Sequence, residues 1–271
     1  MSAWNFMDYS SKANLLDAVE RESAGMLALT ADPSSWTAPT GAGDWEVRDV
    51  VGHLLDTTET YFVGFDAARG KGDPPPSVPL REMAVHADRG ARQFRDLAPG
   101  EARERLSSDL ARMLAIEEAL LEDDWAQPVP HKYMGSLPAF FYPAFQLVDY
   151  AVHSWDIREG TGSPHGLDAR SADLLVPLCF VLWTATAVVA PKDPPLEVGV
   201  RIVSGENAGE TRIGVGPDGL VCAAGPVADL PVVIDFDPGS FVLTAYGRTN
   251  AGTIHGDRDL ADRFLAGFFR I

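Results

Sequence analysis

Hydrophobic residues in the first 160 positions recur with the period of an α-helix, in stretches separated by polar, proline-containing segments. The helical spacing covers five stretches, at residues 11–29, 47–65, 80–97, 101–121 and 145–158. Asp44 is a candidate N-cap for the second stretch, and Gly160 is a candidate C-cap for the fifth. Several amphipathic helices joined by long loops predict a helical bundle.

Proline and glycine mark the expected loops of this half. The segment 70–79 begins with two glycines, continues with a run of prolines and ends on a further proline. This composition excludes a helix. It is either the rim of a substrate site or a rigid connection. Pro128, Pro130 and Pro138 predict a second long loop before the last helix of the bundle.

The pattern changes after about Pro164. One apolar helix is expected over 168–189, followed by residues 196–202, where apolar and polar positions alternate as in a half-buried strand. Further strands are expected at 212–215, 220–223 and 232–236, with a hairpin turn at 216–219, and helices at 241–246 and 257–269. The sequence therefore predicts an α+β protein: a helical bundle over residues 1–165 and a small α+β domain with an antiparallel sheet over 166–271.

Charge restricts the possible partners of this chain. It has 39 acidic and 22 basic residues and a formal net charge of −17, which opposes binding to phosphate backbones or anionic lipids. The N-terminus lacks the pattern of a signal peptide, and the apolar stretch 174–190 contains Pro177 and has no basic flanks. We therefore expect a cytoplasmic protein with neither nucleic acid nor membrane among its partners.

Two of the predicted helices carry the residues with candidate chemistry. His53 lies at the border of the apolar stripe of its helix, and Asp149 and His153 are four residues apart on one face of another, with Asp156 near them. A carboxylate and an imidazole at this spacing can bind one divalent ion, and a histidine from a second helix would complete three ligands. The alternative is a hydrogen-bonded Asp–His pair and an unrelated, partly buried His53.

The sequence around these residues resembles a known family. Residues 45–54, WEVRDVVGHL, resemble the W-x-V-x-D-x-x-x-H-L motif of the mycothiol-dependent maleylpyruvate isomerase family, within the DinB-like metal-binding superfamily. Residues 153–162, HSWDIREGTG, resemble its H-x-W-D-L-x-x-x-T-G motif. Near the C-terminus, YGR at 246–248 and HGDRDLA at 255–261 resemble its closing G-R and G-D-x-x-L-A pattern.

This resemblance implies a DinB-like four-helix bundle followed by a sterol-carrier-like α+β domain. It assigns His53, Asp149 and His153 as ligands of zinc or a related divalent ion, although the family usually has Glu where this chain has Asp149. It also implies mycothiol as a thiol cosubstrate and a catalytic arginine from the C-terminal domain, for which Arg248 is the match.

Other conspicuous residues are interpreted as structural. Asp156 is expected to tie the end of its helix to a neighbouring element, and Trp45 and Trp155 to anchor the core. His86, His131 and His165 have no acidic or cysteine partner at the spacing of metal ligands.

The resemblance thus implies a metal-dependent enzyme that uses a small thiol on an electrophilic substrate, with Arg248 holding a substrate carboxylate or stabilising an enolate. The reaction is either an isomerisation or an S-transfer. The alternative is a non-catalytic protein that sequesters a metal or small ligand. A hydrolase using bound water is a third hypothesis, with Asp156 as its candidate base.

Overall fold

The computed structural model describes residues 2–163, 165–187, 194–217 and 219–267 of the chain. The chain divides into two compact units, Met1–Gly166 and Leu167–Ile271. The first unit is helical and the second combines a sheet with helices, which confirms the predicted α+β class.

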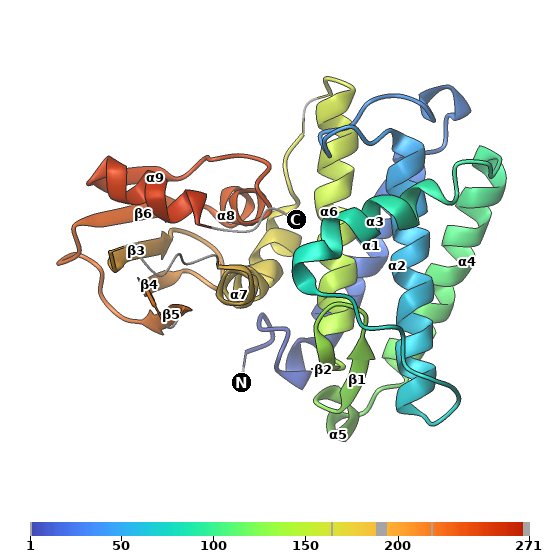
Figure 1. The fold of residues 1–271 in the computed structure, drawn as a ribbon, viewed down its shortest axis with the longest axis horizontal. Coiled ribbons are helices and arrows are strands. Elements are labelled where there is room, and N and C mark those ends of the chain that lie inside the picture. The colour runs from blue at the N-terminus through green and yellow to red at the C-terminus, as the bar shows by residue number, and fades with distance from the viewer. Residues whose placement is uncertain (1, 164, 188–193, 218, 268–271) are drawn as a thin grey trace. The chain divides into compact units, whose positions relative to one another are not determined.

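Four long helices build the first unit: α1 (Lys12–Leu29), α2 (Val47–Ala68), α4 (Pro99–Glu118) and α6 (Phe141–Gly160). The short helices are α3 (Met83–Arg92) and α5 (Glu122–Trp125). Figure 1 shows α1, α2, α4 and α6 as a bundle, with α3 lying across α2. The helix expected at 80–97 is shorter in the structure. Residues Leu80–Glu82 form a 3₁₀ turn, and α3 ends at Arg92.

Helix α6 is the central helix of the bundle. Every residue from 142 to 157 is buried except Asp149. Helix α2 buries the stripe that its sequence predicts, including Val50, Leu54, Tyr61 and Phe65. A single partly exposed carboxylate in this otherwise buried stretch of the helix is the first sign of a functional position.

Two predicted helix caps are wrong. Helix α2 begins after Glu46, whose backbone N–H donates to the Asp49 carboxylate at 2.9 Å, whereas Asp44 pairs with Arg92 instead. Gly160 belongs to the last turn of α6, where a Cβ atom would collide with the backbone of Pro39. Close packing, and not helix termination, is therefore the requirement for glycine at position 160.

The proline-marked segment before α6 is a hairpin, not the predicted loop. Strand β1 (Pro128–His131) pairs with β2 (Gly135–Pro138) in antiparallel register. Pro128 and Pro130 are two residues apart, so their missing N–H groups fall on one edge of β1 and a two-stranded ribbon tolerates them. The segment 70–79 is a loop as predicted, and it is tied to this hairpin where the N–H of Val78 donates to the carbonyl of Lys132 at 2.8 Å.

A buried ion pair joins α2 to the turn after α3. Arg95 donates from Nε and Nη2 to the two carboxylate oxygens of Asp49 at 2.6 and 2.7 Å, and the Asp49 side chain is fully buried. Burial alone would raise the pKa of Asp49, but the bonds from Arg95 and the backbone N–H of Glu46 outweigh it and lower the pKa.

Arg95→Ala is therefore expected to lower the free energy of unfolding by about 2–4 kcal/mol, because it leaves a buried carboxylate without its charged partner. Since the folded state lowers the pKa of Asp49, the stabilisation is present above the unfolded pKa and disappears as the pH falls through the folded one. Urea denaturation at pH 7 and at pH 3 measures both effects. An equal loss of stability at the two pH values would contradict this account.

The second unit contains helices α7 (Ala169–Thr186), α8 (Pro238–Ala245) and α9 (Arg258–Ala266). Its strands are β3 (Leu196–Ile202), β4 (Gly209–Gly216), β5 (Gly219–Ala224), β6 (Val232–Phe236) and β7 (Thr253–Gly256). The sheet order is β5-β4-β3-β6-β7, and all neighbouring pairs are antiparallel except β3 with β6, which is parallel. The sheet is therefore mixed and not antiparallel throughout as predicted, because local alternation does not specify the relative direction of strands that are not consecutive in the sequence. The sequence did not predict β7, and the expected helix ends at 188–189 and 268–269 lie outside the described residues.

Helix α7 is long and apolar enough to cross a membrane by length and composition alone. However, 61% of its 18-residue window is buried inside the protein. Its N-cap Asp168 accepts hydrogen bonds from the backbone of Arg170 and Ser171, as in an ordinary capped helix. These features are those of the buried core helix that the sequence predicts.

Candidate metal centre

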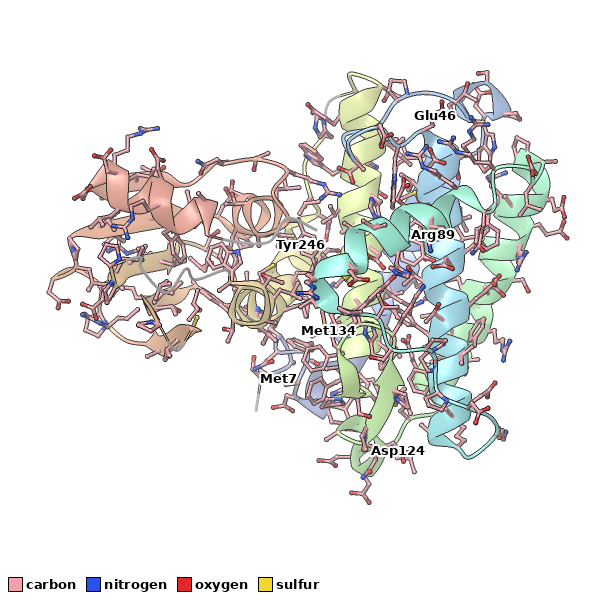
Figure 2. All side chains as sticks on the ribbon, viewed as in Figure 1. Met7, Glu46, Arg89, Asp124, Met134 and Tyr246 are labelled. Atoms are coloured by element: carbon pink, nitrogen blue, oxygen red, sulfur yellow. The ribbon has the colours of Figure 1, made fainter. Side chains whose placement is uncertain are left out.

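The bundle brings three residues from its two central helices together. Among the described residues, His53 of α2 and Asp149 and His153 of α6 each place one ligand atom within 4.8 Å of the other two. Figure 2 draws the side chains of the bundle and labels Glu46 just before α2 and Met134 in the turn between β1 and β2. Asp149 and His153 share a face because four residues make just over one helical turn.

The separations within this group suit a shared cation. Nε2 of His53 lies 3.9 Å from Oδ1 of Asp149, which is too long for a hydrogen bond. Ligand atoms that bind one ion at about 2.0–2.2 Å lie roughly 3–4 Å from one another. Small side-chain rotations therefore suffice to bring all three atoms to one ion.

The hydrogen bonds of the group also fit a cation. In the described part of the chain, no group donates a hydrogen bond to the Asp149 carboxylate, and Nδ1 of His53 is buried without a partner. The side chains of His53, Asp149 and His153 are 15%, 22% and 9% exposed, so the group is sheltered but accessible. The Asp149 carboxylate is thus sheltered, receives no hydrogen bond and faces two imidazoles. Two imidazoles and one such carboxylate are a set of ligands that suits a divalent ion.

Asp156 orients His153. Its carboxylate, which is fully buried, accepts a hydrogen bond from Nδ1 of His153 at 2.8 Å. A neutral imidazole that donates from Nδ1 carries its lone pair on Nε2, the atom through which His153 would bind a metal. The sequence analysis assigned Asp156 to a structural tie, and the i, i+3 spacing from His153 is the signal that would have identified this contact.

Trp45 forms one wall of the group. Its ring centroid lies 5.2 Å from that of His53 and 5.8 Å from that of His153, and the two imidazoles are 5.1 Å apart. Nε1 of Trp45 donates to Asp88 of α3 at 3.0 Å, which fixes the ring. Trp45 is thus a partly exposed residue over the candidate ligands, not the core anchor that the sequence predicted, whereas Trp155 is buried.

We expect Asp156→Asn to weaken binding of a divalent metal by roughly 10–100-fold, the usual effect of losing an outer carboxylate partner of a histidine ligand. The amide still accepts a hydrogen bond but no longer supplies the negative charge that makes the imidazole a stronger ligand. Titration of Zn²⁺ into the metal-free variant measures the change. Glu159→Gln is the matched control, because Glu159 on the same helix pairs with His165 at 2.7 Å, outside the group.

Arg248 lies in the second unit, after α8, where its Nη1 donates to the backbone carbonyl of Tyr246 at 2.9 Å. Its assignment as a catalytic residue stays a prediction.

His255 lies on β7 and contacts Asp235, with 3.0 Å between Nε2 and Oδ2. His165 also has an acidic partner, Glu159, which the sequence analysis did not find.

His131 is the residue near this group that sequence reasoning missed. It ends strand β1 and packs against rings from α2 and α6, with centroid distances of 6.0 Å to Tyr61 and 5.5 Å to Phe145. Burial lowers the pKa of His131 to about 4, although the negative charge of Asp149 acts in the opposite direction. No spacing in the sequence connects position 131 to the two helices, since the hairpin that carries it was expected to be a loop.

Comparison with known proteins agrees with this arrangement. The family model "Mycothiol maleylpyruvate isomerase N-terminal domain" matches residues 16–158, which include His53, Asp149 and His153. No curated protein matches the chain.

Two similar folds are crystal structures of the mycothiol-dependent maleylpyruvate isomerase and of a histidine-to-alanine mutant of that enzyme. The TM-scores are 0.59 and 0.60 at 15% and 14% sequence identity, and in both cases the match covers 89% of this chain and 91% of the other. At this identity the likeness shows a shared fold. Because the family model spans more than half of its residues, this chain belongs to the family that carries the mycothiol maleylpyruvate isomerase N-terminal domain.

Proposed function

We propose that this protein is a metal-dependent enzyme that uses a small thiol, mycothiol by its family, to convert a small electrophilic substrate. The observation that carries the proposal is the group of His53, Asp149 and His153 within 4.8 Å of one another in a chain of this family. Two imidazoles and one carboxylate are a ligand set of catalytic zinc sites, in which further coordination positions belong to water or substrate.

The residues of the chain have separate roles in this proposal. His53, Asp149 and His153 hold the ion, Asp156 keeps His153 in the tautomer that binds, and Trp45 shelters the site from solvent. A bound divalent ion lowers the pKa of a thiol that coordinates it, which makes thiolate available at neutral pH. With one carboxylate and two neutral imidazoles, the loaded site has a net charge of +1, which favours an anionic thiolate.

The thiolate supports two reactions. It adds to an activated alkene and is expelled after rotation about the former double bond, which is a cis–trans isomerisation. Alternatively it attacks an electrophile and stays attached, which is an S-transfer. The residues of the metal group serve both reactions equally.

The test is to incubate zinc-loaded protein with mycothiol and a panel of electrophiles that includes maleylpyruvate. Loss of the cis isomer without consumption of thiol identifies an isomerase, and stoichiometric consumption of thiol identifies an S-transferase. Metal-free protein is the control and should be inactive. A loaded protein that binds these compounds but converts none of them is a sequestering protein, and the proposal is then wrong.

Arg248 is proposed to hold a carboxylate of the substrate, as the family resemblance implies. Arg248→Ala is expected to lower kcat/KM for a carboxylate substrate by roughly 100-fold, the scale on which loss of one charged or hydrogen-bonding group affects catalysis. The metal content should not change, because Arg248 is not among the candidate ligands. Steady-state kinetics with a carboxylate substrate and its methyl ester separate the roles, and an equal loss for both substrates would contradict carboxylate recognition.

A further inference from the structure

The two candidate histidine ligands differ in what fixes their rings. Nδ1 of His153 donates to the buried carboxylate of Asp156 at 2.8 Å, whereas Nδ1 of His53 is buried without a hydrogen-bond partner in the described part of the chain. A histidine that binds a metal usually donates from its second nitrogen to an outer acceptor, and this bond sets the orientation of the ring. The ring of His53 therefore needs a contact of another kind.

Packing between rings supplies this contact. The centroid of the Trp45 indole lies 5.2 Å from that of the His53 ring, at an interplanar angle of 47°. The ring of His153, which Asp156 holds, lies 5.1 Å from His53. Aromatic rings at these separations are in direct contact, so the His53 imidazole cannot turn far unless the indole moves. The orientation of His53 thus depends on how firmly Trp45 is held.

Asp88 of α3 holds the indole. The Nε1–H of Trp45 is the only polar group of that ring, and it donates to Oδ1 of Asp88 at 3.0 Å. Nε of Arg92, one turn later on α3, donates to the same oxygen at 2.6 Å. Burial alone would raise the pKa of Asp88, but the bonds from Arg92 and Trp45 outweigh it and lower the pKa. Asp88 is therefore ionised at neutral pH, and an ionised acceptor makes the stronger hydrogen bond.

Two further contacts hold α3 against the segment that carries Trp45. Nη2 of Arg92 donates to Asp44 at 2.8 Å, and Arg95 donates to both oxygens of Asp49. Figure 1 shows the result, with α3 lying across α2. Asp44 and Asp49 flank Trp45 in the sequence, so the backbone that carries the indole is held on both sides.

We propose that Asp88 is a positioning residue of the metal centre, which orients His53 by holding the indole of Trp45 against it. Asp88 thereby does for His53 through a ring what Asp156 does for His153 through a hydrogen bond. The inference rests on the metal centre of the proposed function and adds to it a residue that does not touch the ion. An imidazole that is already held in its binding orientation loses less freedom when an ion binds, so the ion binds more tightly.

Zinc titration of metal-free protein measures the contribution of Asp88. The Asp88 side chain is 42% exposed, so its truncation is compatible with folding. Asp88→Ala should lower zinc affinity roughly 10-fold or more, the scale for losing an outer partner of a histidine ligand. Asp88→Asn, whose amide oxygen still accepts the indole N–H, should stay within about 3-fold of the natural chain.

Asp44→Ala is the matched control for this titration. It also removes a negative charge and a bond to Arg92, but it leaves the indole bonded to Asp88, so its zinc affinity should be that of the natural chain. Zinc affinity of Asp88→Ala equal to that of the natural chain overturns the proposal. So does a loss in Asp88→Asn as large as in Asp88→Ala, because charge and not the bond to the indole would then be responsible.

Combined substitutions test whether Asp88 acts through the indole. Trp45→Phe keeps a ring but has no N–H for Asp88, so it should lose roughly 10-fold or more in zinc affinity. Adding Asp88→Ala to Trp45→Phe should then cost less than about 3-fold more, because both changes remove the same bond. Natural affinity of Trp45→Phe, or losses that multiply in the double variant, overturns the proposal.

The indole N–H gives a signal that needs no metal. In protein labelled with ¹⁵N-tryptophan, the Nε1–H resonance of Trp45 is the one that Trp45→Phe removes. Its exchange with solvent should become roughly 10-fold faster or more in Asp88→Ala, the scale for losing a hydrogen bond to a charged acceptor. Asp88→Asn should leave the exchange rate within about 3-fold of the natural value. Unchanged exchange in Asp88→Ala overturns the proposal.

The results separate this inference from the proposed function. A natural chain that binds no zinc overturns both. Zinc binding that is insensitive to Asp88→Ala overturns the role of Asp88 and leaves the proposed function standing. If the variants behave as expected but the zinc-loaded natural chain converts no electrophile, the proposed function is wrong and the positioning role of Asp88 stands.

Discussion

Replacing His53 or His153 by alanine is expected to abolish binding of a divalent ion and, with it, thiol-dependent activity. Each substitution removes one of the three candidate ligands that come together in the described part of the chain. Loss of an outer partner of a ligand costs roughly 10–100-fold in metal affinity, so loss of a ligand itself should exceed that range. Elemental analysis of the purified proteins should give close to one divalent ion for the natural chain and none for either variant.

His165→Ala is the matched control for both variants. This histidine also contacts a carboxylate, at 2.7 Å, but does not belong to the metal group. Its metal content and activity should remain those of the natural chain, and circular dichroism should show that all three variants are folded. If His53→Ala and His153→Ala both retain a full complement of metal, the site lies elsewhere.

The second large effect is expected at Asp149, where charge and shape can be separated. Asp149→Asn keeps the shape but removes the only negative charge among the three candidate ligands, which leaves a dication with neutral ligands alone in a sheltered site. We expect a loss of metal affinity of more than 100-fold. Asp149→Glu keeps the charge and restores the residue usual in the family, so its affinity should stay within about 10-fold.

Metal titration of the metal-free variants decides between two roles for Asp149. A carboxylate that only accepts a hydrogen bond from a histidine should lose no more than roughly 10–100-fold in metal affinity when an amide replaces it, whereas a charged ligand should lose more. Near-natural affinity of Asp149→Asn would therefore exclude Asp149 as a ligand. Asp66→Asn is the control, because Asp66 is a partly exposed carboxylate near the end of α2, 3.8 Å from Arg112.

Local sequence patterns predicted most of the elements. The helical stripe of α2, the loop at 70–79, the α+β class and the alternating strand β3 all agree with the structure. Periodicity succeeds at these places because each element buries one face, and a buried face leaves a repeat in the sequence. It failed at the hairpin of residues 128–138, where proline content suggested a loop but two short strands pair across a turn.

The candidate ligands also show which features of the site the sequence predicts and which it does not. The spacing of Asp149 and His153 determines that they share one face of a helix, and the position of His53 determines that it borders an apolar stripe. The sequence alone did not determine that α2 and α6 would bring these side chains within 4.8 Å. That proximity depends on packing between helices almost 100 residues apart, for which a single sequence carries no local pattern.

The amino-acid sequence by itself determined most of the elements, the acidic charge and the family motifs of this protein, because each of these is a property of neighbouring residues. Only the tertiary structure decided that Asp156 holds His153, that Trp45 covers both imidazoles, and that His131 lies among aromatic rings from three segments. The physical reason is that these contacts depend on the packing of whole elements, which places side chains beside one another without requiring any fixed distance between them along the chain.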